Sequence, residues 1–267
     1  MTSQTDHAGI SPGLTAIFAI ACGLMVANLY YAQALIGEIA PALGLHGGVA
    51  GLVVTLTQLG YGAGLFFVVS LADRIENKRL ILLLTAGACL GLIGTWTAAG
   101  AVSFLVFSFV TGFCSVGAQI MVPLAAHLAP EHKRGQVVGN IMGGLITGIM
   151  LARPLANGLA AVAGWRAIFG VSAVAMALLA LLIARTVPAW RPRPTLSYGG
   201  LLRSGLSLLV HTPAIRRRTA YQATMFAAFN LFWTTVPLLL AQRFGLGQMG
   251  IALFALAGAG GALAAPI

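Results

Sequence analysis

The residues that could carry chemistry in this sequence are few, and their spacing favours binding over catalysis. The five histidines lie in tails, loops or expected helix ends, without the spacing of a zinc site or of a nucleophile and its base. Cys22, Cys89 and Cys114 all lie inside apolar stretches, where cysteine is typically a packing residue. The sequence therefore predicts that the protein is not an enzyme, with no metal site, no cofactor and no disulfide.

Arg153 lies in the middle of a long apolar stretch. An arginine that faces lipid at that depth costs at least ~2.5 kcal/mol. We therefore expect its side chain to face an internal cavity or a polar partner. The alternative is that Arg153 lies close enough to the end of its helix for the guanidinium to reach the membrane surface.

The elements that must position these residues are membrane-spanning helices. Residues 51–72 contain no charge, and a helix of that length, at about 1.5 Å per residue, crosses a hydrocarbon layer of about 30 Å. The chain is 59% hydrophobic and 7% charged, with a mean hydropathy of +0.94, which no soluble domain of 267 residues could bury. The pattern predicts helices at about residues 12–36, 51–72, 80–99, 104–128, 137–161, 166–186, 213–242 and 248–267.

The net charge of +10 invites a nucleic-acid interpretation, but the distribution of the charge opposes it. Lys and Arg occur in short clusters between apolar stretches, and not along one face of a fold. Arg166 and Arg243 fall on one side of the expected membrane, and twelve basic residues fall on the other. We therefore expect a multi-pass protein of the plasma (inner) membrane with a cytoplasmic N-terminus. The twelve are Arg74, Lys78, Arg79, Lys133, Arg134, Arg185, Arg191, Arg193, Arg203, Arg216, Arg217 and Arg218.

The turn after the second apolar stretch carries the most specific motif. The residues 71–74 (Leu-Ala-Asp-Arg), followed by Lys78 and Arg79, resemble the loop between helices 2 and 3 of the major facilitator superfamily of transporters. Val69 and Glu76 stand where that family usually has glycine. The resemblance implies a gate, in which a carboxylate stabilises a helix N-terminus in one conformation and releases it in the other. The gating residues that it implies are Asp73, Arg74, Lys78 and Arg79.

The resemblance also implies the fold: an all-α polytopic membrane protein of the superfamily type, built from two six-helix halves. Residues 28–31 (Asn-Leu-Tyr-Tyr) are echoed by residues 230–233 (Asn-Leu-Phe-Trp), as parallel repeats would be. We expect an N-terminal six-helix bundle at residues 1–187, a cytoplasmic linker at 188–216, and helices 7 and 8 of an incomplete second bundle at 217–267. On this comparison the chain is interpreted as C-terminally truncated, either a fragment or a shortened reading frame.

The linker is rich in arginine and proline, and two interpretations of it are equally good. It could be loosely ordered, or it could contain a short amphipathic helix on the membrane surface. The apolar side of that helix would be formed by Leu201, Leu202, Leu206, Leu208 and Leu209.

In the superfamily, helices 1, 4 and 7 line a central cavity. The matching stretches of this chain carry amide and aromatic side chains where leucine would suffice for lipid contact. Together these groups suit an uncharged or mildly amphipathic organic molecule, although for any single residue hydrogen bonding between helices is the alternative. With Arg153 included, the predicted substrate-binding residues are Asn28, Tyr31, Gln33, Gln119, Arg153, Asn230 and Trp233.

The fifth expected helix partly resembles the antiporter pattern of proton-coupled drug exporters in the superfamily. Gly139 and Gly148 have the family spacing, and Pro154 and Gly158 follow, but an arginine occupies the place of a proline. Proton coupling needs a carboxylate or a histidine that alternates between the two sides. Glu38 is the acidic candidate, and the alternative for it is a solvated loop carboxylate.

The implied function is secondary active transport of a small organic solute by alternating access, in the form of proton-coupled efflux. The expected partners are the solute, the lipid bilayer and protons, with no nucleic acid, and the protein is expected to be a monomer. The alternative is a non-transporting relative that binds a ligand or a partner through the same helices.

Overall fold

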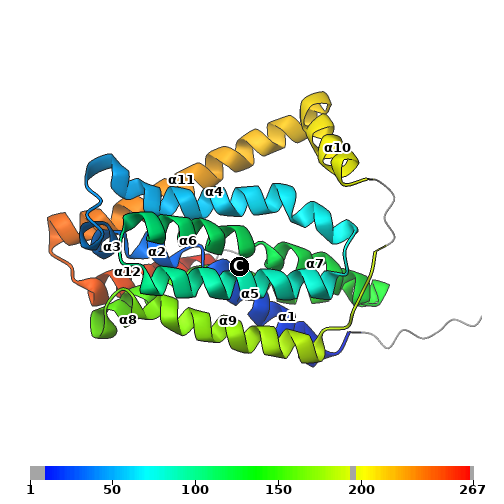
Figure 1. Ribbon diagram of the computed structural model, residues 1–267, viewed down its shortest axis with the longest axis horizontal. Coiled ribbons are helices and arrows are strands. Elements are labelled where there is room, and N and C mark those ends of the chain that lie inside the picture. The colour runs from blue at the N-terminus through cyan, green and yellow to red at the C-terminus, as the bar shows by residue number, and fades with distance from the viewer. Residues whose placement is uncertain (1–9, 193–196, 265–267) are drawn as a thin grey trace, which may run out of the picture.

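The computed structural model describes residues 10–192 and 197–264, which form a bundle of α-helices linked by short turns (Figure 1). Six helices, taken with their adjoining turns, are long and apolar enough to cross a membrane, and two shorter apolar helices accompany them. The expectation of an all-α polytopic protein is therefore confirmed.

The first span is broken into three helices, α1 (Pro12–Ala27), α2 (Tyr31–Ala34) and α3 (Ile36–Ala42). The amides of Leu29 and Tyr30 bond carbonyls three residues back instead of four, which tightens the backbone between α1 and α2. The sequence prediction of one helix to about residue 36, followed by a loop, is wrong here. The break cannot be predicted from the pattern of apolar residues, because every residue from 25 to 36 is buried and the pattern continues across it.

The second span ends in the charged turn that the sequence predicts. A 3₁₀ turn, η1 (Gly47–Gly51), leads into α4 (Leu52–Phe67), and a second one, η2 (Val69–Asp73), ends it. The chain then turns at once into α5 (Asn77–Thr97), so the two spans lie antiparallel, as Figure 1 shows.

The next spans complete the bundle. The fourth is interrupted at Ser115, whose Oγ donates to the carbonyl of Thr111 at 2.7 Å, a bond that competes with the helix ladder and bends it. The elements are α6 (Ala101–Cys114), α7 (Gly117–Leu128), η3 (Glu131–Lys133), α8 (Arg134–Ala163) and α9 (Ala167–Thr186).

Small residues bring α1 and α8 into backbone contact. A side chain on Gly148 would collide with the backbone of Gly23, and one on Gly144 would collide with Ala19. Small residues at such a contact let two membrane helices approach each other closely. Gly143, by contrast, faces open space, so not every glycine of α8 serves packing.

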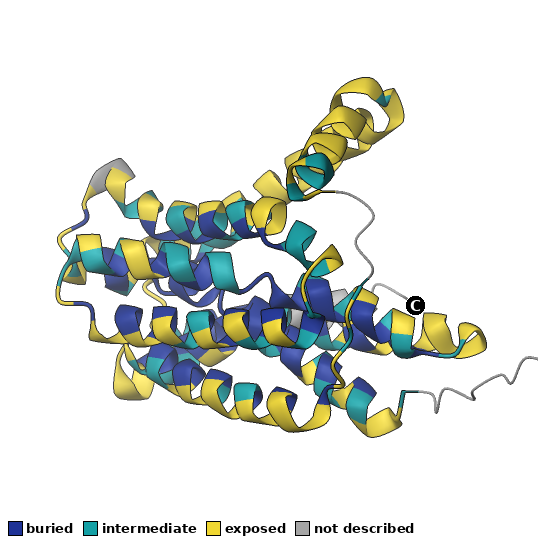
Figure 2. Cartoon of the chain, turned by 45° about the vertical axis from the view of Figure 1, so that its right-hand side comes forward, coloured by how far each residue is buried: buried dark blue, intermediate teal, exposed yellow. Residues whose placement is uncertain are grey.

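The C-terminal part of the described chain comprises α10 (Tyr198–His211), α11 (Pro213–Phe244) and α12 (Gln248–Ala264). Residues 198–211 of the linker form the helix α10, which agrees with the interpretation that the linker contains a short helix. At its start, the Oγ of Ser197 accepts a hydrogen bond from the amide of Gly200. Figure 2 shows that α10 and the adjoining part of α11 are exposed, whereas the interior of the bundle is buried. α12 packs against α8, whereas α11 meets the bundle mainly at α2 and α3.

Candidate functional site

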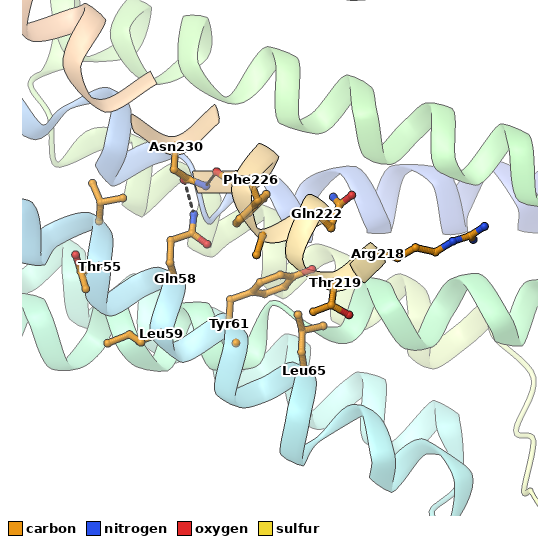
Figure 3. A pocket seen from close by; sticks show the side chains of 13 residues that line it. Thr55, Gln58, Leu59, Tyr61, Leu65, Arg218, Thr219, Gln222, Phe226 and Asn230 are labelled. Carbon is orange, nitrogen blue, oxygen red and sulfur yellow. Dashed lines mark hydrogen bonds between the residues drawn. The ribbon is translucent and has the colours of Figure 1, made fainter. Parts of the chain in front are cut away.

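A cavity of about 950 Å³ lies between α4 and α11 (Figure 3). Its volume is in the range of small-molecule sites. All of its walls come from these two helices, which lie about 160 residues apart in the sequence. The lining residues are Val54, Thr55, Gln58, Leu59, Tyr61, Gly62, Leu65, Arg218, Thr219, Gln222, Ala223, Phe226 and Asn230.

The cavity is closed at one end and open at the other. Figure 1 shows α4 and α11 close together near α3 and diverging towards α10. Asn230 lies at the narrow end, and the exposed Arg218 lies towards the wide end, as Figure 3 shows.

The exposed surface of the lining is largely apolar, and Gln58 and Tyr61 of α4 contribute two of its polar groups. The amide nitrogen of Gln58 donates to Oδ1 of Asn230 at 3.2 Å, which joins α4 to α11 at the narrow end (Figure 3). The Oε1 of Gln58 is buried without a donor among the described residues. The hydroxyl of Tyr61 accepts from Nε2 of Gln119 at 3.0 Å, so the predicted residue Gln119 acts on the cavity through a tyrosine.

Four side chains, Gln33, Arg153, Asn230 and Thr234, close the narrow end, and we call them the closing cluster. Gln33 is fully buried in α2, and its Nε2 lies 2.9 Å from Oγ1 of Thr234, 3.1 Å from the carbonyl oxygen of Asn230 and 3.3 Å from Oδ1 of Asn230. Its Oε1 accepts from Nη2 of Arg153 at 2.9 Å. One glutamine therefore connects α2, α8 and α11.

The guanidinium of Arg153 is enclosed by aromatic rings. Its Cζ lies 4.5 Å from the ring centroid of Trp233, 4.6 Å from that of Tyr30 and 5.1 Å from that of Phe229. Such cation–π contacts stabilise a desolvated cation. With 3% of its surface exposed, Arg153 faces the interior, and the alternative that its guanidinium reaches the membrane surface is excluded.

Two predicted residues lie away from this cavity, on the side of α1 that faces α9. Asn28 accepts from Oγ of Ser172 at 2.7 Å and approaches Sδ of Met176 at 3.6 Å. Tyr31 lines a separate pocket of about 450 Å³ between α1, α8 and α9. Tyr31 follows the tightened turn between α1 and α2, whereas Asn28 precedes it at the C-terminal end of α1.

Glu38 is half-buried in the first turn of α3. The neighbouring Gly37 lies beside Leu238, so this part of α3 abuts α11 at the narrow end of the cavity. Within the described residues, no basic side chain forms an ion pair with Glu38.

The turn between α4 and α5 places the predicted gating residues at the surface. Asp73, Arg74 and Arg79 are exposed, and Lys78 is half-buried. The carboxylate at the centre of the turn is Glu76, which the sequence singles out only as a departure from the family pattern.

Glu76 joins the turn to the segment after α9. Its Oε2 lies 3.4 Å from Nε of Arg79 and 3.1 Å from Nε of Arg191, and the amide of Asn77 donates to the carbonyl of Trp190 at 3.0 Å. An acid where the family has glycine, in a chain with a strongly basic linker, is the signal that could have indicated this contact.

Sequence reasoning also missed Gln58, Tyr30, Phe229 and Thr234, although the four-residue spacing of Phe229 and Trp233 predicts one shared helix face.

The family model described as Major Facilitator Superfamily matches residues 14–267 of the chain. The chain is 44% identical over 232 residues to "Uncharacterized transporter YgaY" of Escherichia coli O157:H7, a match that covers 87% of this chain and 59% of that protein. It is 33% identical over 258 residues to a protein of Streptomyces coelicolor named a "Probable transporter", covering 94% of this chain and 59% of the relative. The chain thus spans less than two thirds of the length of these relatives.

Among solved structures, the fold is similar to that of a crystal structure of a D-xylose-proton symporter, with a TM-score of 0.66 and 13% sequence identity. That match covers 92% of this chain and 65% of the symporter chain. At this identity the likeness concerns the fold alone, and it agrees with the fold class that the charged turn between α4 and α5 implies.

Proposed function

The chain belongs to the major facilitator superfamily, and from this premise we propose that it moves a small organic solute across a membrane by alternating access. The observation that carries the proposal is the 950 Å³ cavity between α4 and α11, which is closed at one end by the closing cluster. A site that is open at one end and sealed by reversible side-chain contacts at the other suits a carrier that exposes one site to two sides in turn.

The wide end of the cavity is the cytoplasmic end in this proposal. Arg218, α10 and the turn between α4 and α5 all lie towards that end, and together they carry five of the fifteen Lys and Arg of the chain. The structure then corresponds to an inward-open state in the inner membrane, with the N-terminus in the cytoplasm. The contact of Gln33 with Asn230 and Thr234 would be the part that separates when the outer side opens.

The proposed binding groups follow from the lining. Gln58 and Asn230 contact the solute directly, Gln119 orients Tyr61, and Gln33, Arg153 and Trp233 close the outer end. Asn28 supports the site from behind, because its hydrogen bond with Ser172 joins the end of α1 to α9, and Tyr31 lines the neighbouring pocket.

Export is the proposed direction, with protons as the coupling ion. The support for export is the partial antiporter pattern of α8, in which Gly139, Gly148, Pro154 and Gly158 recur. Glu38 is the proposed proton carrier, since its carboxylate lies where α3 meets α11 and a change in its charge acts on that contact. The turn between α4 and α5 acts as the gate, through the charge of Asp73.

The test is solute accumulation by inverted membrane vesicles from cells that express the protein at its natural length. Vesicles with the wild-type protein should accumulate solutes that control vesicles do not. Asp73→Asn should abolish this uptake while the protein still reaches the membrane, and Glu131→Gln, which alters an exposed carboxylate in η3, should leave uptake unchanged.

Two outcomes would contradict the proposal. If no solute accumulates, the protein is a non-transporting relative that binds a ligand or a partner. If Asp73→Asn transports at the wild-type rate, the assignment of Asp73 as a gating residue is wrong. A pH gradient that changes uptake in the wild type but not in Glu38→Gln would support proton coupling through Glu38.

A further inference from the structure

Arg153 is a buried cation that no described carboxylate neutralises. The described acidic residues, Glu38, Asp73, Glu76 and Glu131, lie in α3, in the charged turn and in η3, and the two ion pairs among the described residues both involve Glu76. A lone charge inside a membrane protein is expensive and typically marks a substrate or ion pathway.

The hydrogen bonds of Arg153 are incomplete. A guanidinium carries five N–H donors, and here Nη2 donates to Gln33 at 2.9 Å and Nη1 donates weakly to the carbonyl of Ile149 at 3.4 Å. The Nε atom is buried and has no acceptor among the described residues. Arg153 therefore retains donors for an acceptor that the described side chains do not provide.

The rings that cover the guanidinium come from two parts of the chain that the transport cycle would separate. Tyr30 precedes α2 and stays with α8, whereas Phe229 and Trp233 belong to α11. When α11 moves away from α2, two of the three rings leave the guanidinium. The opening thus exposes a cation with unused donors to the solute path.

The other end of the path is also cationic. Arg218 lies in the cavity lining at the wide end, and no Asp or Glu lines the cavity. A solute that passes between α4 and α11 therefore meets positive charge at the wide end, positive charge at the narrow end once Arg153 is uncovered, and a largely apolar lining between them.

We propose that the transported solute is an organic anion with an apolar body, and that its carboxylate pairs with Arg153 when the outer end opens. A guanidinium binds a carboxylate through two parallel hydrogen bonds, and the unpaired Nε is one of the donors that such a pair uses. The unpartnered Oε1 of Gln58 accepts from a hydroxyl or amine of the same solute. The inference rests on the proposed transport function, and it differs from the uncharged solute that the amide and aromatic side chains predict.

The experiment uses inverted membrane vesicles and, as the probe, a small-molecule extract of cells that lack the protein. Compounds that accumulate in wild-type vesicles but not in control vesicles are identified by mass, and their charge at pH 7 is assigned. We expect them to be carboxylates. Arg153→Gln should lower their accumulation at least about tenfold, and Arg153→Lys, which keeps the charge but cannot form both hydrogen bonds, should lower it less. The matched control is Arg185→Gln, which removes an exposed positive charge at the end of α9.

The possible outcomes test the anion inference, the role of Arg153 and the transport function separately. Accumulated compounds that are neutral or cationic would overturn the anion inference and leave the transport function standing. Carboxylates that Arg153→Gln vesicles accumulate as well as the wild type would overturn the role of Arg153. No accumulation by the wild type would overturn the proposed function itself, and the anion inference with it.

Discussion

The Nε of Arg191 lies 3.1 Å from Oε2 of Glu76, and this contact joins the segment after α9 to the turn between α4 and α5. The side chain of Glu76 is 12% exposed, whereas that of Arg191 is 70% exposed. A salt bridge with one largely solvated partner contributes less than about 1 kcal/mol. The contact therefore contributes little to holding the fold together, and it is weak enough to break and re-form in the proposed gate.

A double-mutant cycle of Glu76→Gln and Arg191→Gln measures this coupling. Each single variant should lower the transport rate by less than about fivefold, because the interaction is worth less than about 1 kcal/mol. The double variant should lose little more than either single one. The measurement is the initial uptake rate in vesicles at low and at high salt. The coupling between the two substitutions should be smaller at high salt, because Arg191 is exposed and salt screens its charge. Strictly additive effects of the two substitutions would show that the residues act independently.

Gln33→Leu should shift the protein towards an outward-open state. The substitution removes the hydrogen bonds of Gln33 to Asn230 and Thr234, which join α2 to α11, and each is worth about 1 kcal/mol. A loss of two or three such bonds changes the equilibrium between the two states by roughly 30- to 150-fold.

The shift can be measured at Ala34, a buried residue of α2. In a background without the native cysteines, Ala34→Cys should react at least about tenfold faster with a membrane-impermeant maleimide, applied from outside, when Gln33→Leu is present. Gln242→Leu, an exposed glutamine of α11, is the matched control and should not change the rate. Equal labelling with and without Gln33→Leu would rule out the closing cluster as the outer seal.

The sequence predicts the fold class of this protein better than its site. Apolar stretches and short charged clusters depend on composition alone, which is why the spans and the turn at Asp73 are recognisable without a structure. The direction of a side chain depends on every residue before it in the helix. Asn28, at the end of α1, contacts Ser172, and Tyr31, after the tightened turn at Leu29 and Tyr30, lines a separate pocket.

Arg153 shows the opposite case. The membrane penalises an unpaired charge so strongly that its inward direction follows from the sequence, and its 3% exposure agrees. Its partners do not follow, because Gln33 and Trp233 lie 120 residues before it and 80 after it and meet it only through the packing of α2, α8 and α11.

Gly148→Ala should destabilise the protein, although the change adds only one methyl group. The new Cβ would collide with the backbone of Gly23, and α1 would have to move away from α8. Overpacking of this kind costs about 1–3 kcal/mol. Gly143→Ala is the matched control on the same helix, since its Cβ would face open space and alanine favours a helix over glycine by about 0.5–1 kcal/mol.

The midpoint of thermal unfolding in detergent distinguishes the two variants. The midpoint of Gly148→Ala should fall below that of the wild type, and the midpoint of Gly143→Ala should equal or exceed it. Equal midpoints for both variants would mean that α1 and α8 are not in backbone contact in the membrane.

The orientation of the chain decides which end of the cavity faces the cytoplasm, and two single cysteines test it. Lys133→Cys lies at the exposed turn before α8, and Ala163→Cys lies at the exposed far end of the same helix. Since most Lys and Arg lie on the side of Lys133, the positive-inside rule predicts that an impermeant maleimide labels Ala163→Cys in intact cells. Lys133→Cys should be labelled only after the cells are permeabilised. The reverse pattern would place Arg218 and the wide end of the cavity outside, so that the structure would be outward-open and the closing cluster would seal the inner side.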